Sequence, residues 1–136
     1  QQAMRTLGFT IARMEPGEVD LAMDYSPALT QQNGFVHAGI ITAGLDTACG
    51  IAAFTLMPAG SDILTVEFKT NLLAPASGTR FLFRAEVIKP GRTLTISEAR
   101  AFALRDGREH LIATMTGTLM AMLRREPAAE KALSPA

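Results

Sequence analysis

The sequence contains no tryptophan, one cysteine and only two histidines among its 136 residues. Because a lone cysteine, Cys49, cannot form an intramolecular disulfide, the chain shows no sign of an oxidising compartment. The two histidines, His37 and His110, are too few and too far apart in the sequence to suggest a zinc site. We therefore expect neither a bound metal nor a cofactor.

An excess of charge is also absent, since thirteen basic side chains balance thirteen acidic ones. Nucleic-acid binding needs a basic face, so we expect no nucleic-acid partner. Residues 1–7 lack the apolar core of a signal peptide. The weakly charged run 38–60 is long enough to approach a membrane span, but it contains Asp46 and has no flanking basic clusters. We interpret it as a buried helix of a soluble cytoplasmic protein with no membrane partner.

What the chain does contain is enough apolar sequence for a core. Hydrophobic residues make up 48% of it and charged residues 19%, which excludes disorder of the whole chain. The length suits a single domain, which we place at residues 1–126. Residues 127–136 are rich in alanine and proline, and we expect them to form a disordered tail.

Hydrophobic periodicity divides the domain into strands and one helix. Alternating apolar residues on both sides of Pro16-Gly17 predict a hairpin within residues 9–24. Apolar residues then recur every three or four positions, which predicts a helix over about 38–57. The predicted apolar face consists of Ile41, Leu45, Ala48, Ala52 and Leu56. Beyond this helix the period returns to two, with turn signals at 75–78, 89–91 and 105–107.

These elements predict an α+β fold, in which an antiparallel sheet of five or six strands wraps around one long central helix. Such an open sheet leaves two edges whose backbone groups are unpaired. Pairing between subunits is a natural way to cover an edge, so we expect a dimer.

Asp46 is the only charged residue between His37 and Asp62. A carboxylate inside an apolar helix costs free energy unless it is solvated, paired or functional. Its helical neighbours three and four positions away are all small, which leaves room for a ligand or another chain. The position is equally consistent with an aspartate that binds a structural partner across a dimer.

The start of the predicted helix is a second candidate feature. Ala38 and Gly39 offer unpaired N–H groups at the positive end of the helix dipole, which can stabilise an oxyanion. His37 could orient this turn, contact a substrate or be purely structural. Asp46 lies eight residues beyond Ala38, about 12 Å along the helix axis. One chain cannot bring both groups to one substrate atom, whereas two antiparallel helices across a two-fold interface could, so an active site here should be shared between subunits.

Five motifs follow one another along the chain. They are residues 33–39 (Asn-Gly-Phe-Val-His-Ala-Gly), 46–48 (Asp-Thr-Ala), 65–68 (Thr-Val-Glu-Phe), 74–76 (Ala-Pro-Ala) and 89–93 (Lys-Pro-Gly-Arg-Thr). With nine positions from His37 to Asp46, they closely resemble the hotdog-fold acyl-CoA thioesterases of the phenylacetate-degradation (PaaI-like) branch, over about residues 8–123. The resemblance implies a hotdog fold and homodimers that pair into homotetramers.

The resemblance also implies roles for single residues. Asp46 matches the acidic residue that acts as nucleophile or as general base for water, and Thr65 matches a residue that positions this water. Ala38 stands where the family usually has the first glycine of a His-Gly-Gly motif, and its N–H would polarise the thioester carbonyl. Alanine can do this if its φ and ψ are helical. His37 matches the histidine of the motif.

Further substrate contacts follow from the same resemblance. Gln31 stands where the family often has asparagine, and Asn33 is the nearby alternative. The turn that contains Gly91 and Arg92 resembles a segment that contacts CoA, with Arg92 as a phosphate partner, although it could be an ordinary hairpin tip. The remaining expected substrate contacts are Gly39 and Thr47.

Together these features favour an acyl-CoA thioesterase that acts on an aryl or a short- to medium-chain acyl-CoA. One alternative is a hydratase or dehydratase of acyl thioesters on the same fold, but its His-Phe-Pro-Gly-like turn is absent. A second alternative is a non-catalytic acyl-CoA binding module. Such a module has little reason to place a carboxylate at a reacting carbonyl.

Overall fold

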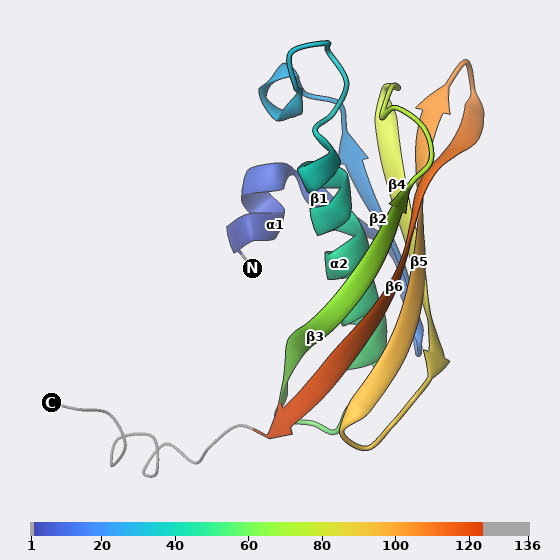
Figure 1. The fold of residues 1–136 in the computed structure, drawn as a ribbon. Coiled ribbons are helices and arrows are strands. Elements are labelled where there is room, and N and C mark those ends of the chain that lie inside the picture. The colour runs from blue at the N-terminus through green and yellow to red at the C-terminus, as the bar shows by residue number, and fades with distance from the viewer. Residues whose placement is uncertain (1, 124–136) are drawn as a thin grey trace, which may run out of the picture.

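A six-stranded antiparallel sheet and one long helix dominate the computed structural model, which describes residues 2–123 (Figure 1). The strands are β1 (Phe9–Glu15), β2 (Glu18–Asp24), β3 (Ser61–Leu72), β4 (Arg80–Lys89), β5 (Leu94–Arg105) and β6 (Arg108–Leu123). The helices are α1 (Gln2–Leu7), a short 3-10 turn at Pro27–Leu29, and α2 (Ala38–Phe54). The predicted α+β class and strand number are confirmed, whereas the predicted tail lies outside the described residues.

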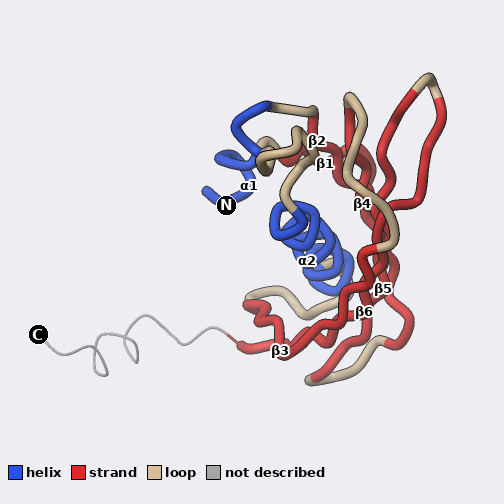
Figure 2. The backbone as a smooth tube through the Cα atoms, turned by 45° about the horizontal axis from the view of Figure 1, so that its top comes forward, coloured by secondary structure: helices blue, strands red, loops and turns tan. Residues whose placement is uncertain are grey.

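The strands lie in the order β1-β2-β4-β5-β6-β3. After α2 the chain therefore crosses to the far side, where β3 pairs with β6 and forms one edge, while β1 forms the other. The sheet curves around α2, as Figure 2 shows. Within residues 2–123, no helix is long and apolar enough to cross a membrane.

Two of the predicted turns have the backbone geometry that their residues favour. Gly17 joins β1 to β2 with φ at 77°, a left-handed value that glycine adopts without strain. Asp106 and Gly107 join β5 to β6 with φ at 52° and 71°. Two successive positive φ values are typical of the tight hairpin turns that Asp-Gly pairs form.

Helix α2 begins at the predicted residue but ends at Phe54, three residues before the predicted end. Thr55 holds this end in place, because its Oγ1 accepts the N–H of Gly17 and donates to the carbonyl of Ala52, both at 2.7 Å. The chain then tightens into turns ahead of Pro58, which disfavours a helical residue before it. The prediction that Leu56 belongs to the buried helix face is wrong, since it is 44% exposed.

One face of α2 packs against the concave side of the sheet. Its four other predicted core positions, Ile41, Leu45, Ala48 and Ala52, are 2% exposed or less. Gly44 permits this close approach, because a Cβ there would collide with the ring of Phe83 on β4. Because the sheet covers this face, the side of α2 that carries Asp46 stays partly exposed to solvent.

Candidate active site

Asp46 lies in the middle of α2 and is only partly buried. The Oγ1 atom of Thr65 on β3 donates a hydrogen bond of 2.9 Å to its Oδ1. A β-bulge between Thr65 and Glu67 adds one residue to β3 at this point. Thr65, which the resemblance places near the carboxylate as a residue that positions water, thus contacts Asp46 directly, and its hydroxyl occupies only one of the carboxylate's acceptor positions.

A depression of about 600 Å³ lies beside this carboxylate. We call it the carboxylate groove, and its lining residues are Asp46, Thr47, Gly50, Ile51, Phe54, Asp62, Ile63 and Thr65. The helix residues among them recur on one side of α2, so the groove follows the helix from its middle to its C-terminal end. Thr47, a predicted substrate contact, lies in this groove.

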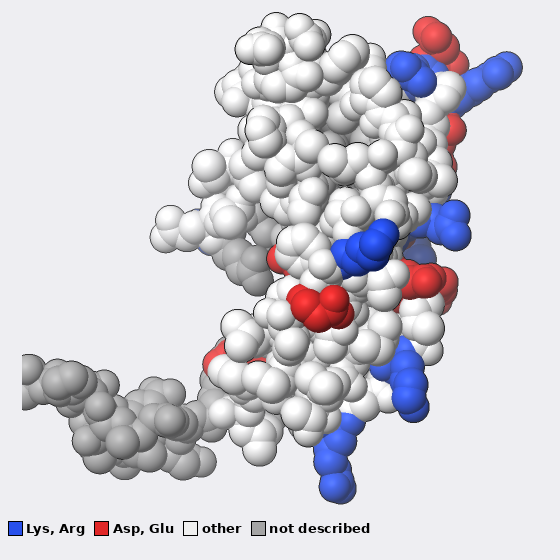
Figure 3. Space-filling model, in the orientation of Figure 1, with Lys and Arg blue, Asp and Glu red and all other residues white. Residues whose placement is uncertain are grey.

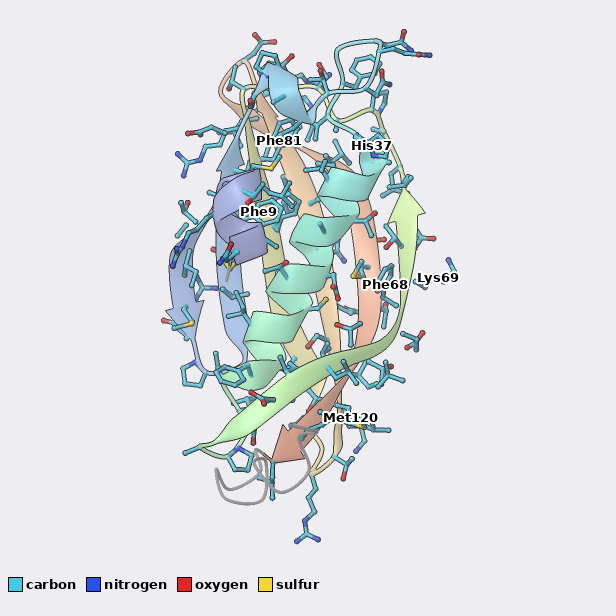
Figure 4. All side chains as sticks on the ribbon, turned by 90° about the vertical axis from the view of Figure 1, so that its left-hand side faces the viewer. Phe9, His37, Phe68, Lys69, Phe81 and Met120 are labelled. Atoms are coloured by element: carbon cyan, nitrogen blue, oxygen red, sulfur yellow. The ribbon has the colours of Figure 1, made fainter. Side chains whose placement is uncertain are left out.

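His37 caps the N-terminal end of α2, where Figure 4 labels it. Its Nδ1 accepts the N–H of Gly39 at 2.8 Å, and its carbonyl oxygen accepts the N–H of Ile40 at 2.9 Å. Residue 39 must be small, because a Cβ there would lie 2.9 Å from Nδ1 of His37. The cap leaves Ala38 as the first helical residue, whose N–H has no acceptor within the helix.

A second depression, of about 430 Å³, opens beside Ala38. We call it the helix-end pocket, and its lining residues are Gln31, Phe35, Val36, His37, Ala38, Ile41, Leu72, Ala74, Pro75, Ala76, Ile112 and Ala113. Of the two alternatives for the family's asparagine, Gln31 lines this pocket, whereas Asn33 is exposed and does not. The side-chain oxygen of Gln31 accepts the N–H of Asn33 and so closes the loop between them.

The carboxylate groove and the helix-end pocket share no lining residue. Ala38 and Asp46 are both on α2, eight residues or about 12 Å apart along its axis. A single chain therefore does not bring the carboxylate and the helix N-terminus to the same point. Gly39, a predicted substrate contact, takes part in the helix cap and lines neither depression.

Gly91 and Arg92 lie in the exposed turn between β4 and β5. The N–H of Gly91 donates to Oγ1 of Thr95 at 3.3 Å, and a Cβ at Gly91 would collide with the carbonyl oxygen of Leu94. The structure brings neither residue into the two depressions. The turn is instead a separate surface feature.

Two other ionisable groups have well-defined structural positions. Cys49 is buried against the sheet, and burial raises the pKa of its thiol to about 12, so it stays protonated. Arg84 makes two hydrogen bonds of 2.7 Å to Glu109, and these lower the pKa of the Glu109 carboxyl. Among residues 2–123, no three His, Cys, Asp or Glu side chains are grouped as metal ligands would be.

Comparisons with known sequences identify a family and several relatives. Residues 33–109 match the model of the thioesterase superfamily. A protein of Saccharolobus solfataricus named "Putative esterase" is 30% identical over 97 residues, which cover 71% of this chain and 69% of that protein.

Solved structures agree with the sequence comparisons. A thioesterase family protein from Silicibacter pomeroyi is 60% identical and superimposes with a TM-score of 0.90, covering 91% of each chain. A mutant of the phenylacetic acid degradation protein PaaI from Thermus thermophilus has the same fold. It is 22% identical, with a TM-score of 0.76 over 88% of this chain and 98% of that one.

Proposed function

The chain belongs to the thioesterase superfamily and is a thioester hydrolase with a hotdog fold, and we propose that its substrate is an acyl-CoA. The proposed products are CoA and an aryl or a short- to medium-chain carboxylic acid. We place the reaction at a site formed by two subunits.

The observation that carries this proposal is the separation of two complementary groups on one helix. Asp46 with Thr65 supplies a carboxylate, and the N-terminus of α2 supplies the N–H of Ala38, which has no acceptor within the helix. If two α2 helices pack antiparallel about a two-fold axis, Asp46 of one subunit faces Ala38 of the other. Two identical sites then arise in each dimer.

The surface of the described chain favours this pairing. The edge strand β3 exposes Leu64, Val66, Phe68 and Leu72, each between 43% and 58%. Phe68 is labelled on this strand in Figure 4, which also shows that no strand or helix of residues 2–123 crosses the N-terminal half of α2 from the front. In Figure 3 most charged side chains lie along the right-hand margin, which includes the β5–β6 turn, while one acidic and one basic side chain lie mid-face over β3. β3 also exposes Glu67 and Lys69, but its four exposed apolar side chains beside a partly exposed helix face fit a second copy of the chain.

The chemistry follows from the two groups. The N–H of Ala38 donates to the thioester carbonyl oxygen and stabilises the negative charge that this oxygen acquires. Asp46 of the other subunit either takes a proton from the attacking water, which Thr65 helps to position, or attacks the carbonyl carbon itself. In the second route an acyl–aspartyl anhydride forms as the thiolate leaves, and water then cleaves the anhydride to release the acid and restore the carboxylate. The carbon–sulfur bond breaks, the thiolate of CoA leaves and is protonated, and water supplies the new oxygen of the acid.

Two further features belong to the same proposal. Arg92, in the turn with Gly91, offers a guanidinium for the phosphates of CoA. Gln31 lies at the helix-end pocket, where its amide can contact the thioester or hold the loop before α2. We also propose that dimers pair into a homotetramer.

The test is release of free thiol from aryl, short-chain and long-chain acyl-CoAs by the wild type and by Asp46→Ala. Turnover of one acyl class, lost in Asp46→Ala while its melting temperature is unchanged, supports the proposal. If no acyl-CoA releases thiol, the acyl-CoA substrate is wrong. Hydration of enoyl-CoA or binding of acyl-CoA without turnover would then identify the alternative.

A further inference from the structure

The convex side of the sheet carries an ordered pattern of charge. Helices α1 and α2 both lie on the concave side, as Figures 2 and 4 show, so neither of them covers the convex side. Strands β4 and β5 are the third and fourth of the six strands and form its middle. Alternate residues of β5 from Thr95 to Ala103 are buried, so the residues between them point to the convex side.

The convex residues of β5 have a self-complementary order of two apolar side chains, an acid, a base and two apolar side chains. They are Leu94, Ile96, Glu98, Arg100, Phe102 and Leu104, and we call them the β5 palindrome. The neighbouring strand β4 repeats the middle of this order. Its residues Leu82, Arg84 and Glu86 pair with Phe102, Arg100 and Glu98, respectively. An apolar row, a basic row and an acidic row therefore cross the two strands.

Within one chain, the two charged rows are unfavourable. Glu86 lies directly opposite Glu98, and like charges in such a cross-strand pair destabilise a sheet. The same holds for Arg84 and Arg100, although Arg84 also makes two hydrogen bonds of 2.7 Å to Glu109. The side chains of Glu86, Glu98 and Arg100 make no hydrogen bond or ion pair with any residue of 2–123. All three line one shallow depression of about 410 Å³ on the convex side.

A second copy of this face supplies the missing partners. Ala85 pairs with Ala99, and this pair lies between the basic row and the acidic row. Consider a two-fold axis that runs across the strands along this pair, between two facing sheets. It places the acidic row of each face on the basic row of the other, so that Glu98 faces Arg100 of the copy.

The flanking positions obey the same symmetry. Ile96 faces Phe102 of the copy, so apolar side chains meet on both sides of the charges. On β2, Glu18 faces Asp20 of the copy, but Arg13 binds both carboxylates within each chain, at 2.8 and 3.2 Å. A two-fold contact needs a self-complementary surface, whereas an unrelated partner does not. The palindrome therefore favours a second copy of this chain as the occupant.

We infer that the homotetramer forms when two dimers pack their convex faces together over β4 and β5, with Arg100 of one chain bound to Glu98 of another. This inference rests on the assembly part of the proposed function and identifies the surface that joins the dimers. The dimer itself uses α2 and the edge strand β3, so both contacts can form at once. The active sites, beside α2, then lie on the opposite side of the sheet from the contact.

The test measures the mass of the full chain in solution by light scattering, at one protein concentration for all variants. The wild type should be a tetramer. Glu98→Arg and Arg100→Glu each place like charges at both symmetry-related contacts, and each should halve the mass. The double variant Glu98→Arg/Arg100→Glu exchanges the two charges and should restore the tetramer. Arg105→Glu is the matched control, because it reverses an exposed charge outside the palindrome and should leave the mass unchanged.

Three results would overturn the inference. They are a wild type no larger than a dimer, a tetramer that persists in both single variants, and a double variant that stays dimeric. Melting temperatures measured on the same samples show whether each variant is folded. Because the two single reversals are independent, either one is a sufficient test if the other does not fold.

Thiol release separates this inference from the proposed reaction. Since Asp46 and Ala38 lie on the other side of the sheet, dimeric Arg100→Glu should keep kcat within about twofold of the wild type. A dimer with less than about a tenth of that kcat contradicts the separation of contact and active site. If no acyl-CoA is turned over but the masses follow the expected pattern, only the proposed acyl-CoA substrate is wrong.

Discussion

Replacement of Ala38 by proline removes the backbone N–H of residue 38 from the site and should change little else in the structure. Proline lacks the backbone N–H but is favoured at the first position of a helix, where that N–H has no helical acceptor. The preceding residue, His37, has φ at −59° and ψ at 136°, the extended conformation that a residue before proline adopts. The fold should therefore survive, with a free energy of unfolding within about 1 kcal/mol of the wild type.

The catalytic loss should be large. Removing one oxyanion donor lowers kcat by roughly 10²–10³, which corresponds to about 3–4 kcal/mol of transition-state stabilisation. The assay is steady-state thiol release from the best acyl-CoA substrate, with thermal melting measured on the same samples. Ala38→Gly is the matched control, because it keeps the N–H and should stay within about tenfold of the wild type. If folded Ala38→Pro retains more than a tenth of wild-type kcat, this N–H is not the oxyanion donor.

Two further predictions concern the neighbours of the carboxylate. Thr65→Val removes the hydrogen bond to Asp46 and should lower kcat about 10- to 100-fold, as expected for a hydrogen bond to a charged group, whereas Thr65→Ser keeps the hydroxyl and should retain most activity. Equal losses in both variants would show that the hydroxyl is unimportant. Cys49, with its pKa raised to about 12, should react with a thiol reagent at pH 8 only after the protein is unfolded, and rapid labelling of the native protein would contradict its burial.

Local sequence patterns predict the elements of the fold well where one strong signal dominates. The three- and four-residue spacing gives α2, and Pro16-Gly17 and Asp106-Gly107 give two hairpins. The helix end was less predictable, because Thr55 is held by a turn 38 positions earlier in the chain. The short helix α1 has no comparable periodicity and was not predicted.

Edge strand β3 shows why periodicity does not identify the buried face. Its apolar residues Leu64, Val66 and Phe68 alternate as in a half-buried strand, yet all three are more than 40% exposed in one chain. The bulge after Thr65 shifts the register, and the helix covers Thr65 instead. A period of two does not predict the bulge.

The site was predictable only in part. The isolated carboxylate of Asp46 and the helix start at Ala38 follow from the sequence, and so does their separation along α2. The partnership of Asp46 with Thr65 came from the family resemblance, since the two residues are 19 positions apart in the sequence. A side chain at residue 39 would collide with the imidazole of His37. No residue spacing in the sequence indicates where that imidazole lies.

The central claim is that each active site combines Asp46 of one subunit with Ala38 of the other. The most direct test mixes two inactive variants, Asp46→Ala and Ala38→Pro, and measures thiol release after subunit exchange has been verified with two affinity tags. Random exchange makes half of the dimers mixed, and each mixed dimer contains one intact site of two, so about a quarter of wild-type activity should return. No recovery in verified mixed dimers would contradict the shared site.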